Sequence, residues 1–176
     1  MKKILIAATI LLACTAAVAA QGTCLRYPEN GAGFSFCPPD SWTIEEQAGE
    51  KYKVMFGTGA NFRPNINIRE QTSAGTLAEY AELAKKLIVS KENIEKLGAT
   101  TLVVLDQSEF ITTSGLSGIK VTYQTEFKGY LIRSMQYYFE LKGGRKIIAT
   151  FTGMVAEKEK LDPILDRSMK TFRIEN

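Results

Sequence analysis

Alternation of apolar and polar residues dominates the chain and predicts a mainly antiparallel β-sheet. A period of two residues is typical of strands that bury one face. Short connections that contain glycine indicate hairpins between successive strands, at Phe127-Lys128-Gly129 and at Gly143-Gly144-Arg145. The predicted strands are 52–56, 65–69, 102–110, 118–127, 130–141 and 146–154.

The length of each hairpin turn decides which side chains share a face of this sheet. Turns of three residues would gather the apolar side chains of the last three strands on one face, whereas two-residue turns would mix them with polar ones. We therefore predict three-residue turns. The predicted apolar face carries Ile119, Val121, Tyr123, Leu131, Met135, Tyr137, Phe139, Ile147, Ala149 and Phe151. The predicted polar face carries Lys120, Thr122, Gln124, Glu126, Ser134, Gln136, Tyr138, Glu140, Thr150 and Thr152.

Two segments have the period of helices. Thr76 and Glu79 form a capping box at the start of the first, and Gly98 is expected to end it or a second turn over 91–97. The second segment, near the C-terminus, should pack on the apolar face of the sheet. The order of strands, helix, meander and helix predicts an α+β domain, an antiparallel sheet with packed helices. The two apolar stripes are Leu77, Tyr80, Leu83, Ala84, Leu87 and Ile88, and Leu161, Ile164, Leu165, Met169 and Phe172.

The N-terminus has the features of a secretory signal peptide. Lys2 and Lys3 precede an apolar run over 4–13, and small residues follow as far as Ala20. The run is shorter than the roughly 20 apolar residues needed to span a bilayer. The sequence thus predicts a leader over 1–20 and a single mature domain over 21–176.

Cys14 leaves an alternative to simple cleavage. The segment 11–14, Leu-Leu-Ala-Cys, resembles a bacterial lipobox, in which the cysteine is lipidated and becomes the first mature residue. We favour cleavage near Gln21, which gives a periplasmic or otherwise extracytoplasmic soluble chain. Lipidation of Cys14 would instead give a membrane-anchored lipoprotein.

The remaining two cysteines, Cys24 and Cys37, are predicted to form a disulfide, because an even number in an oxidising compartment is typical of one. We expect a hairpin in which Tyr27 lies opposite Phe34. That register places Cys24 opposite Cys37, at the separation that a disulfide needs. The alternative is two buried free thiols.

Composition excludes several classes of function. The 22 basic and 19 acidic residues become 20 and 19 once Lys2 and Lys3 leave with the leader, so no basic face for nucleic acid is indicated. The chain has no histidine, which removes the usual Ser-His-Asp and Cys-His catalysts. We find no catalytic, cofactor or metal motif. An enzyme using Glu, Tyr or Lys, and a Ca²⁺ site built from loop carboxylates, remain open alternatives.

Four residues are candidates for contact with a ligand or partner. Arg133 falls on the predicted apolar face, opposite Tyr123, where it either pairs with a carboxylate or receives an anionic or carbonyl ligand. Tyr130 and Tyr138 fall on the polar face, which is either a solvated sheet surface or a recognition surface.

A set of turn and core features is characteristic of one known fold. These features are Gly33-Phe34-Ser35-Phe36, Pro38, Trp42, Asn65-Ile66-Asn67-Ile68, the entry 115–118, Gly143-Gly144 and the ending 168–173. With them the chain resembles the PsbP/DcrB-like family over about residues 27–174. The resemblance implies an α/β/α sandwich and a non-enzymatic role, and the periplasmic branch fits the leader best. Histidines of the photosynthetic members have no counterpart here, and we expect no cofactor.

Together these observations predict an exported, non-enzymatic binding or interaction module of the bacterial cell envelope. Its partner would be a protein or a small ligand, met at the polar sheet face or the meander loops. A small-ligand-binding or structural lipoprotein anchored through Cys14 is the alternative. Contact with a membrane is expected only in that lipidated form.

Overall fold

The protein is built around one seven-stranded antiparallel sheet. The computed structural model describes residues 24–28, 31–59 and 62–175, so the predicted leader and Cys14 lie outside the described residues. The strands follow the order β2-β3-β4-β8-β7-β6-β5. Their bounds are β2 (Thr43–Glu45), β3 (Val54–Phe56), β4 (Asn65–Thr72), β5 (Thr101–Ile111), β6 (Ser117–Phe127), β7 (Tyr130–Glu140) and β8 (Arg145–Met154).

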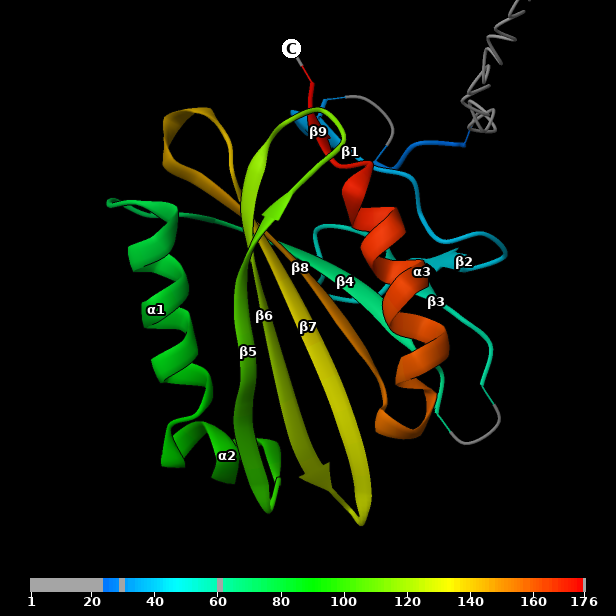
Figure 1. Cartoon of the computed structure of the whole chain (residues 1–176), viewed down its shortest axis with the longest axis vertical. Coiled ribbons are helices and arrows are strands. Elements are labelled where there is room, and N and C mark those ends of the chain that lie inside the picture. Colours follow the sequence, from blue (N-terminus) through cyan, green and yellow to red (C-terminus); the bar gives the residue numbers. More distant parts are fainter. Residues whose placement is uncertain (1–23, 29–30, 60–61, 176) are drawn as a thin grey trace, which may run out of the picture.

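Helices cover both faces of the sheet, which makes the domain an α/β/α sandwich. Helices α1 (Leu77–Ile88) and α2 (Lys91–Leu97) lie on one side, and α3 (Lys158–Lys170) lies on the other (Figure 1). A second, two-stranded sheet joins β1 (Phe34–Ser35) to β9 (Arg173–Ile174). This is the α+β architecture that the sequence predicts. Within the described ranges no helix is long and apolar enough to cross a membrane.

The sandwich has two separate apolar cores, because successive residues of the central strands point to opposite faces. On β7, Tyr137 and Phe139 contribute to the core under α3, while Tyr138 contributes to the core under α1. Phe139 stacks on Phe172 just beyond α3, with ring centroids 4.0 Å apart. The α1 core consists of Ala81, Leu102, Val121, Tyr123, Tyr138 and Ile148.

The predicted three-residue turn between β6 and β7 is wrong. Phe127 pairs with Tyr130, so the turn contains only Lys128 and Gly129. Consequently the face that carries Val121 and Tyr123 is the α1 face, not the α3 face as predicted. A sheet that is buried on both sides has apolar residues on both faces. The separation of polar from apolar side chains therefore assigned the residues of β6 to the wrong face.

The predicted shared face of β7 and β8 is confirmed, although the turn spans 142–144 rather than the predicted 143–145. Met135 pairs with Phe151, Tyr137 with Ala149, and Phe139 with Ile147, so these side chains share the α3 face. The turn between β7 and β8 has an odd number of residues, as predicted. The apolar residues of both strands are therefore assigned to the correct face.

The local signals of the first helix are confirmed. Thr76 accepts a hydrogen bond from the Glu79 amide and the Glu79 carboxylate accepts one from the Thr76 amide, which is the predicted capping box. Gly98 ends α2 in the left-handed conformation. However, Leu83 and Leu87 of the predicted apolar stripe are 57% and 61% exposed, because α1 covers only part of the sheet.

The predicted register of the N-terminal hairpin is also corrected. Tyr27 pairs with Phe36 rather than with Phe34. Phe34 pairs instead with Ile174 of β9, and its ring is buried against Phe172. The C-terminal strand therefore takes the position that the predicted hairpin partner would have occupied.

Candidate functional site

A groove runs between α1 and the part of the sheet that α1 leaves uncovered, and we call it the α1 groove. Its volume is about 410 Å³, which lies within the range of ligand-binding pockets. The helix packs on β6 and β7, so the neighbouring faces of β8 and β4 stay open beside it. The lining residues are Asn67, Arg69, Gln71, Tyr80, Leu83, Ala84, Leu87, Ile88, Gln136, Tyr138, Ile148 and Thr150.

The two sides of the α1 groove differ in polarity. The α1 side presents aliphatic groups, chiefly the exposed Leu83 and Leu87. The β4 side is polar, because Asn67, Arg69 and Gln71 alternate with the buried isoleucines of the same strand. A ligand lying in the groove would therefore meet apolar surface on one flank and hydrogen-bonding groups on the other.

Hydrogen bonds order the polar groups of the groove. The Tyr138 hydroxyl donates to Gln136 Oε1, and the Gln136 amide donates to the Thr150 hydroxyl at 3.3 Å. The Tyr80 hydroxyl donates to Gln71 in the same way. Burial raises the pKa of both tyrosines, so both hydroxyls stay protonated donors at neutral pH.

The structure separates the four candidate contact residues. Tyr138 lines the α1 groove, and Tyr123 is 2% exposed in the core beneath α1. Tyr130 is half exposed at the start of β7, beside the two-residue turn. Arg133 lies opposite Gln124, not opposite Tyr123 as predicted, and it faces α3.

Arg133 has the carboxylate partner that one of the two sequence interpretations expects. Its Nη2 atom lies 2.8 Å from Asp162 Oδ2, and both side chains are largely shielded from solvent. Nearby, Asp166 of α3 accepts hydrogen bonds from Lys120 at 2.7 Å and from the Tyr137 hydroxyl at 2.6 Å. These contacts tie α3 to the sheet.

Most of the groove was missed at the level of sequence. Asn67, Arg69 and Gln71 read as the solvent face of a short strand, and Leu83 and Leu87 read as core positions. The width of the apolar stripe on α1 could have indicated the groove. Its six apolar residues are more than one side of the helix can bury against the sheet. Gln136, Tyr138 and Thr150 of the predicted polar face do line the groove, although Tyr138 is only 1% exposed.

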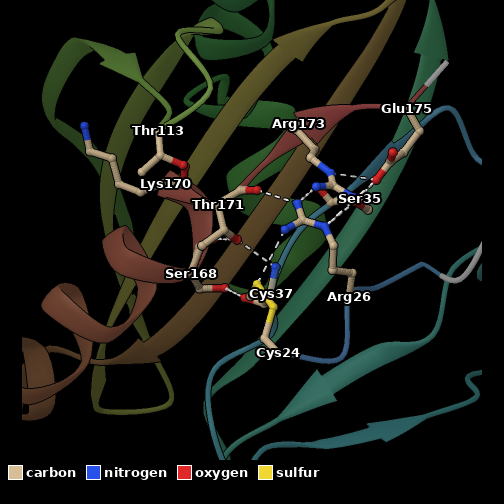
Figure 2. Close-up of a disulfide and its surroundings, with 10 residues drawn as sticks. All are labelled: Cys24, Arg26, Ser35, Cys37, Thr113, Ser168, Lys170, Thr171, Arg173 and Glu175. Carbon is tan, nitrogen blue, oxygen red and sulfur yellow. Dashed lines mark hydrogen bonds and ion pairs between the residues drawn. A yellow bond between two sulfur atoms is a disulfide. The ribbon is translucent and has the colours of Figure 1, made fainter. Parts of the chain in front are cut away.

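A second cluster of polar contacts surrounds the predicted disulfide, and we call it the Arg26 cluster. Cys24 and Cys37 are joined as predicted, with Cα atoms 5.7 Å apart (Figure 2). The Arg26 guanidinium donates to the Ser35 hydroxyl at 2.7 Å and to the Thr171 carbonyl at 2.6 Å. It therefore links the N-terminal segment to the end of α3.

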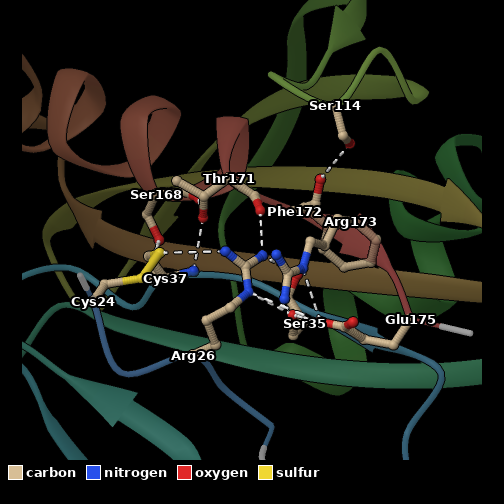
Figure 3. Close-up of polar contacts among 10 residues, drawn as sticks. All are labelled: Cys24, Arg26, Ser35, Cys37, Ser114, Ser168, Thr171, Phe172, Arg173 and Glu175. Carbon is tan, nitrogen blue, oxygen red and sulfur yellow. Dashed lines mark hydrogen bonds and ion pairs between the residues drawn. A yellow bond between two sulfur atoms is a disulfide. The ribbon is translucent and has the colours of Figure 1, made fainter. Parts of the chain in front are cut away.

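The C-terminal strand completes the Arg26 cluster. Glu175 accepts a hydrogen bond from the Ser35 hydroxyl and lies 3.9 Å from Arg26 (Figure 3). Arg173 pairs with the same carboxylate at 2.9 Å. Hydrogen bonds, chiefly from Ser35, hold the pKa of Glu175 below its usual range.

Metal-binding geometry is missing from the parts of the chain that the structure describes. Over those residues, no three Cys, Asp or Glu side chains are grouped as a cation would need. The carboxylates described above are instead paired with arginine, lysine or hydroxyl donors.

Comparison with known proteins identifies the fold. No protein-family model and no curated protein matches the sequence. The solution structure of cyanobacterial PsbP from Synechocystis matches 86% of this chain and 92% of its own, with a TM-score of 0.62 and 12% sequence identity. The chain has the PsbP-like fold.

Other structures share this PsbP-like fold. LpqN of Mycobacterium tuberculosis, described as involved in cell envelope biogenesis, matches 88% of this chain and 90% of its own, with a TM-score of 0.61 and 14% identity. The Ran-binding protein Mog1p of Saccharomyces cerevisiae matches 81% and 90%, with a TM-score of 0.55 and 10% identity. At these identities the likeness concerns the scaffold, and function has to be argued from the site.

Proposed function

We propose that the protein is an exported, non-enzymatic binding module of the bacterial cell envelope, and that the α1 groove is its binding site. The observation that carries this proposal is the division of the groove into an aliphatic flank and a hydrogen-bonding flank. Leu83 and Leu87 expose apolar surface beside an open pocket. Contiguous exposed apolar surface is typical of a site that contacts a ligand or a partner.

The chemistry of the lining suits recognition rather than reaction. The Tyr80 and Tyr138 hydroxyls are already engaged with the amide side chains of Gln71 and Gln136. Arg69, the charged residue of the lining, faces Glu50 at 3.3 Å. The amide and hydroxyl groups of the lining are neutral donors and acceptors, which orient a ligand that has both an apolar and a polar part.

Export is supported by the leader and by the paired cysteines, because disulfides persist in oxidising compartments. LpqN, which shares the fold, is described as involved in cell envelope biogenesis. The lipidated form remains the alternative. The intact mass of the mature protein distinguishes the two, since acyl chains on Cys14 and a start at Gln21 exclude each other.

A fluorescent amphiphile tests the binding site directly. Anilinonaphthalene sulfonate, which has an apolar ring system and an anionic group, should bind the full-length mature protein saturably. Leu83→Glu removes an apolar contact and places a negative charge that repels the sulfonate, so it should weaken binding about tenfold, the effect of roughly 1.4 kcal/mol.

The matched control is Leu97→Glu, which changes a helical leucine that is 50% exposed and does not line the groove. This variant should bind like the wild type. Equal affinity of all three proteins, or equal loss in both variants, would place the binding elsewhere and overturn the proposal.

A further inference from the structure

The disulfide has a cation beside one of its two sulfur atoms. Arg26 Nη1 donates toward Cys37 Sγ at 3.7 Å (Figure 3). The same guanidinium is fixed by Ser35 and by the Thr171 carbonyl, so its position does not depend on the sulfur contact. A fixed positive charge stabilises a thiolate at the sulfur it touches.

The two cysteines are also held differently. The Cys37 amide donates to the Thr171 hydroxyl at 2.7 Å, and the Cys37 carbonyl accepts from Ser168, so this residue is fixed to the end of α3 (Figure 2). Cys24 precedes Leu25, which is 93% exposed. Both cysteines are partly buried, so the difference between them lies in the hydrogen bonds that fix Cys37 to the end of α3.

The charges around Cys37 have to be weighed together. The C-terminal end of α3 carries partial negative charge, which destabilises a thiolate at Cys37. Glu175 also partly neutralises the charge of Arg26. However, Arg26 donates directly to the Thr171 carbonyl, which offsets the helix end, and Arg173 adds a second positive charge at the same carboxylate. Arg26 is the group in contact with sulfur, so its charge acts at the shortest distance.

We propose that Cys24–Cys37 is a directional thiol-exchange site, at which an incoming thiolate attacks Cys24 and Cys37 departs as a thiolate stabilised by Arg26. Exchange is faster when the departing thiol is the more acidic. The chemical class of the partner is a thiol, either a monothiol or the first cysteine of a dithiol oxidoreductase. The proposal is independent of the α1 groove.

The exchange balances as follows. The partner's thiolate sulfur forms a bond to Cys24 Sγ, the Cys24–Cys37 bond breaks, and its electron pair leaves on Cys37. With a dithiol partner, the second thiolate then attacks the mixed disulfide and releases Cys24. The partner is oxidised to a disulfide by two electrons, and the two cysteines take up two protons.

Cleavage would release Cys24 but not the segment that follows it. Tyr27 and Phe36 exchange two backbone hydrogen bonds, at 2.8 and 2.9 Å, and Arg26 remains bound to Thr171. The fold from Arg26 onward therefore keeps these contacts when the bridge is open.

Brief exposure of the oxidised wild-type protein to glutathione, followed by acid quench and alkylation, tests the direction. Peptide mapping should place glutathione on Cys24 and the alkyl group on Cys37. Glutathione on Cys37, or an equal distribution between the two, would overturn the proposal without need of any variant.

The role of the cation is tested by rate. Arg26→Gln should slow the exchange by about threefold or more, because the departing thiolate loses its positive neighbour. Arg63→Gln is the matched control, since this arginine pairs with Glu45 outside the Arg26 cluster, and its rate should equal that of the wild type. Equal rates for Arg26→Gln and the wild type would remove Arg26 from the mechanism.

Discussion

The Glu70 carboxylate lies 2.6 Å from Arg145 Nε, and so joins β4 to β8 by an ion pair as well as by their strand pairing. The Tyr52 hydroxyl donates to the same carboxylate at 2.6 Å and Lys51 approaches it at 2.8 Å. The hydrogen bond from Arg145, followed by those from Lys51 and Tyr52, lowers the pKa of Glu70 to about 2.

We expect Glu70→Gln to destabilise the domain by about 2 kcal/mol at pH 7, since a charged acceptor of several hydrogen bonds is lost. The folded-state pKa is depressed, so this stabilisation is present above the unfolded pKa of about 4.3 and disappears as the pH falls toward 2. Urea titrations at pH 7 and at pH 2.5 should show the difference shrinking. Glu50→Gln, at a more exposed pair, should change little at either pH.

Removal of the Tyr137 hydroxyl should loosen α3. Tyr137→Phe deletes the hydrogen bond to Asp166 and is expected to cost about 1 kcal/mol. Tyr130→Phe changes a half-exposed tyrosine and should stay within about 0.5 kcal/mol of the wild type. Thermal unfolding measures both, and equal values would show that the hydroxyl contributes nothing to the attachment of the helix.

The two-residue turn between β6 and β7 makes its own prediction. Lys128 has φ +49° and Gly129 has φ +78°, the left-handed conformations in which Asn-Gly turns are favoured. Lys128→Asn should therefore stabilise the protein by about 0.5–1 kcal/mol. A three-residue turn would gain nothing from this change, so unchanged unfolding would contradict the observed register.

Loss of the disulfide should weaken the domain without unfolding it. Cys24 and Cys37 are 13 residues apart, and a loop of that size contributes about 3 kcal/mol through the unfolded state. The double variant to serine should thus keep the circular dichroism spectrum of the wild type and unfold at lower urea concentration. A spectrum without native structure would show that the cores do not suffice alone.

Local patterns predicted most of the fold. The Thr76–Glu79 capping box, Gly98 and the bounds of the four long strands β5 to β8 depend on neighbouring residues, and all could be read from the sequence. The short strands β2 and β9 were not predicted. Parity across the β6–β7 turn could not, because Val121 and Met135 are equally apolar but serve different cores. Which helix covers which face is a property of the tertiary structure, and no alternation within a strand records it.

The α1 groove was hidden for a related reason. Leu83 and Leu87 have the spacing of core residues, and only the position of α1 over β6 and β7 leaves them exposed. The Cys24–Cys37 pair was predictable from count and compartment, although the register offered for it was wrong. The cation at its sulfur comes from Arg26, whose place depends on the end of α3.

The contact between Arg26 and Glu175 brings the two ends of the described domain together (Figure 3). Neighbouring ends allow a domain to be spliced into a surface loop of a host protein, or to be permuted by joining its ends and opening another turn. The bend at Lys128 and Gly129 is a natural place for such an opening. A domain inserted in this way would be joined to its host by two connections on the same side. Neither connection would cover the α1 groove.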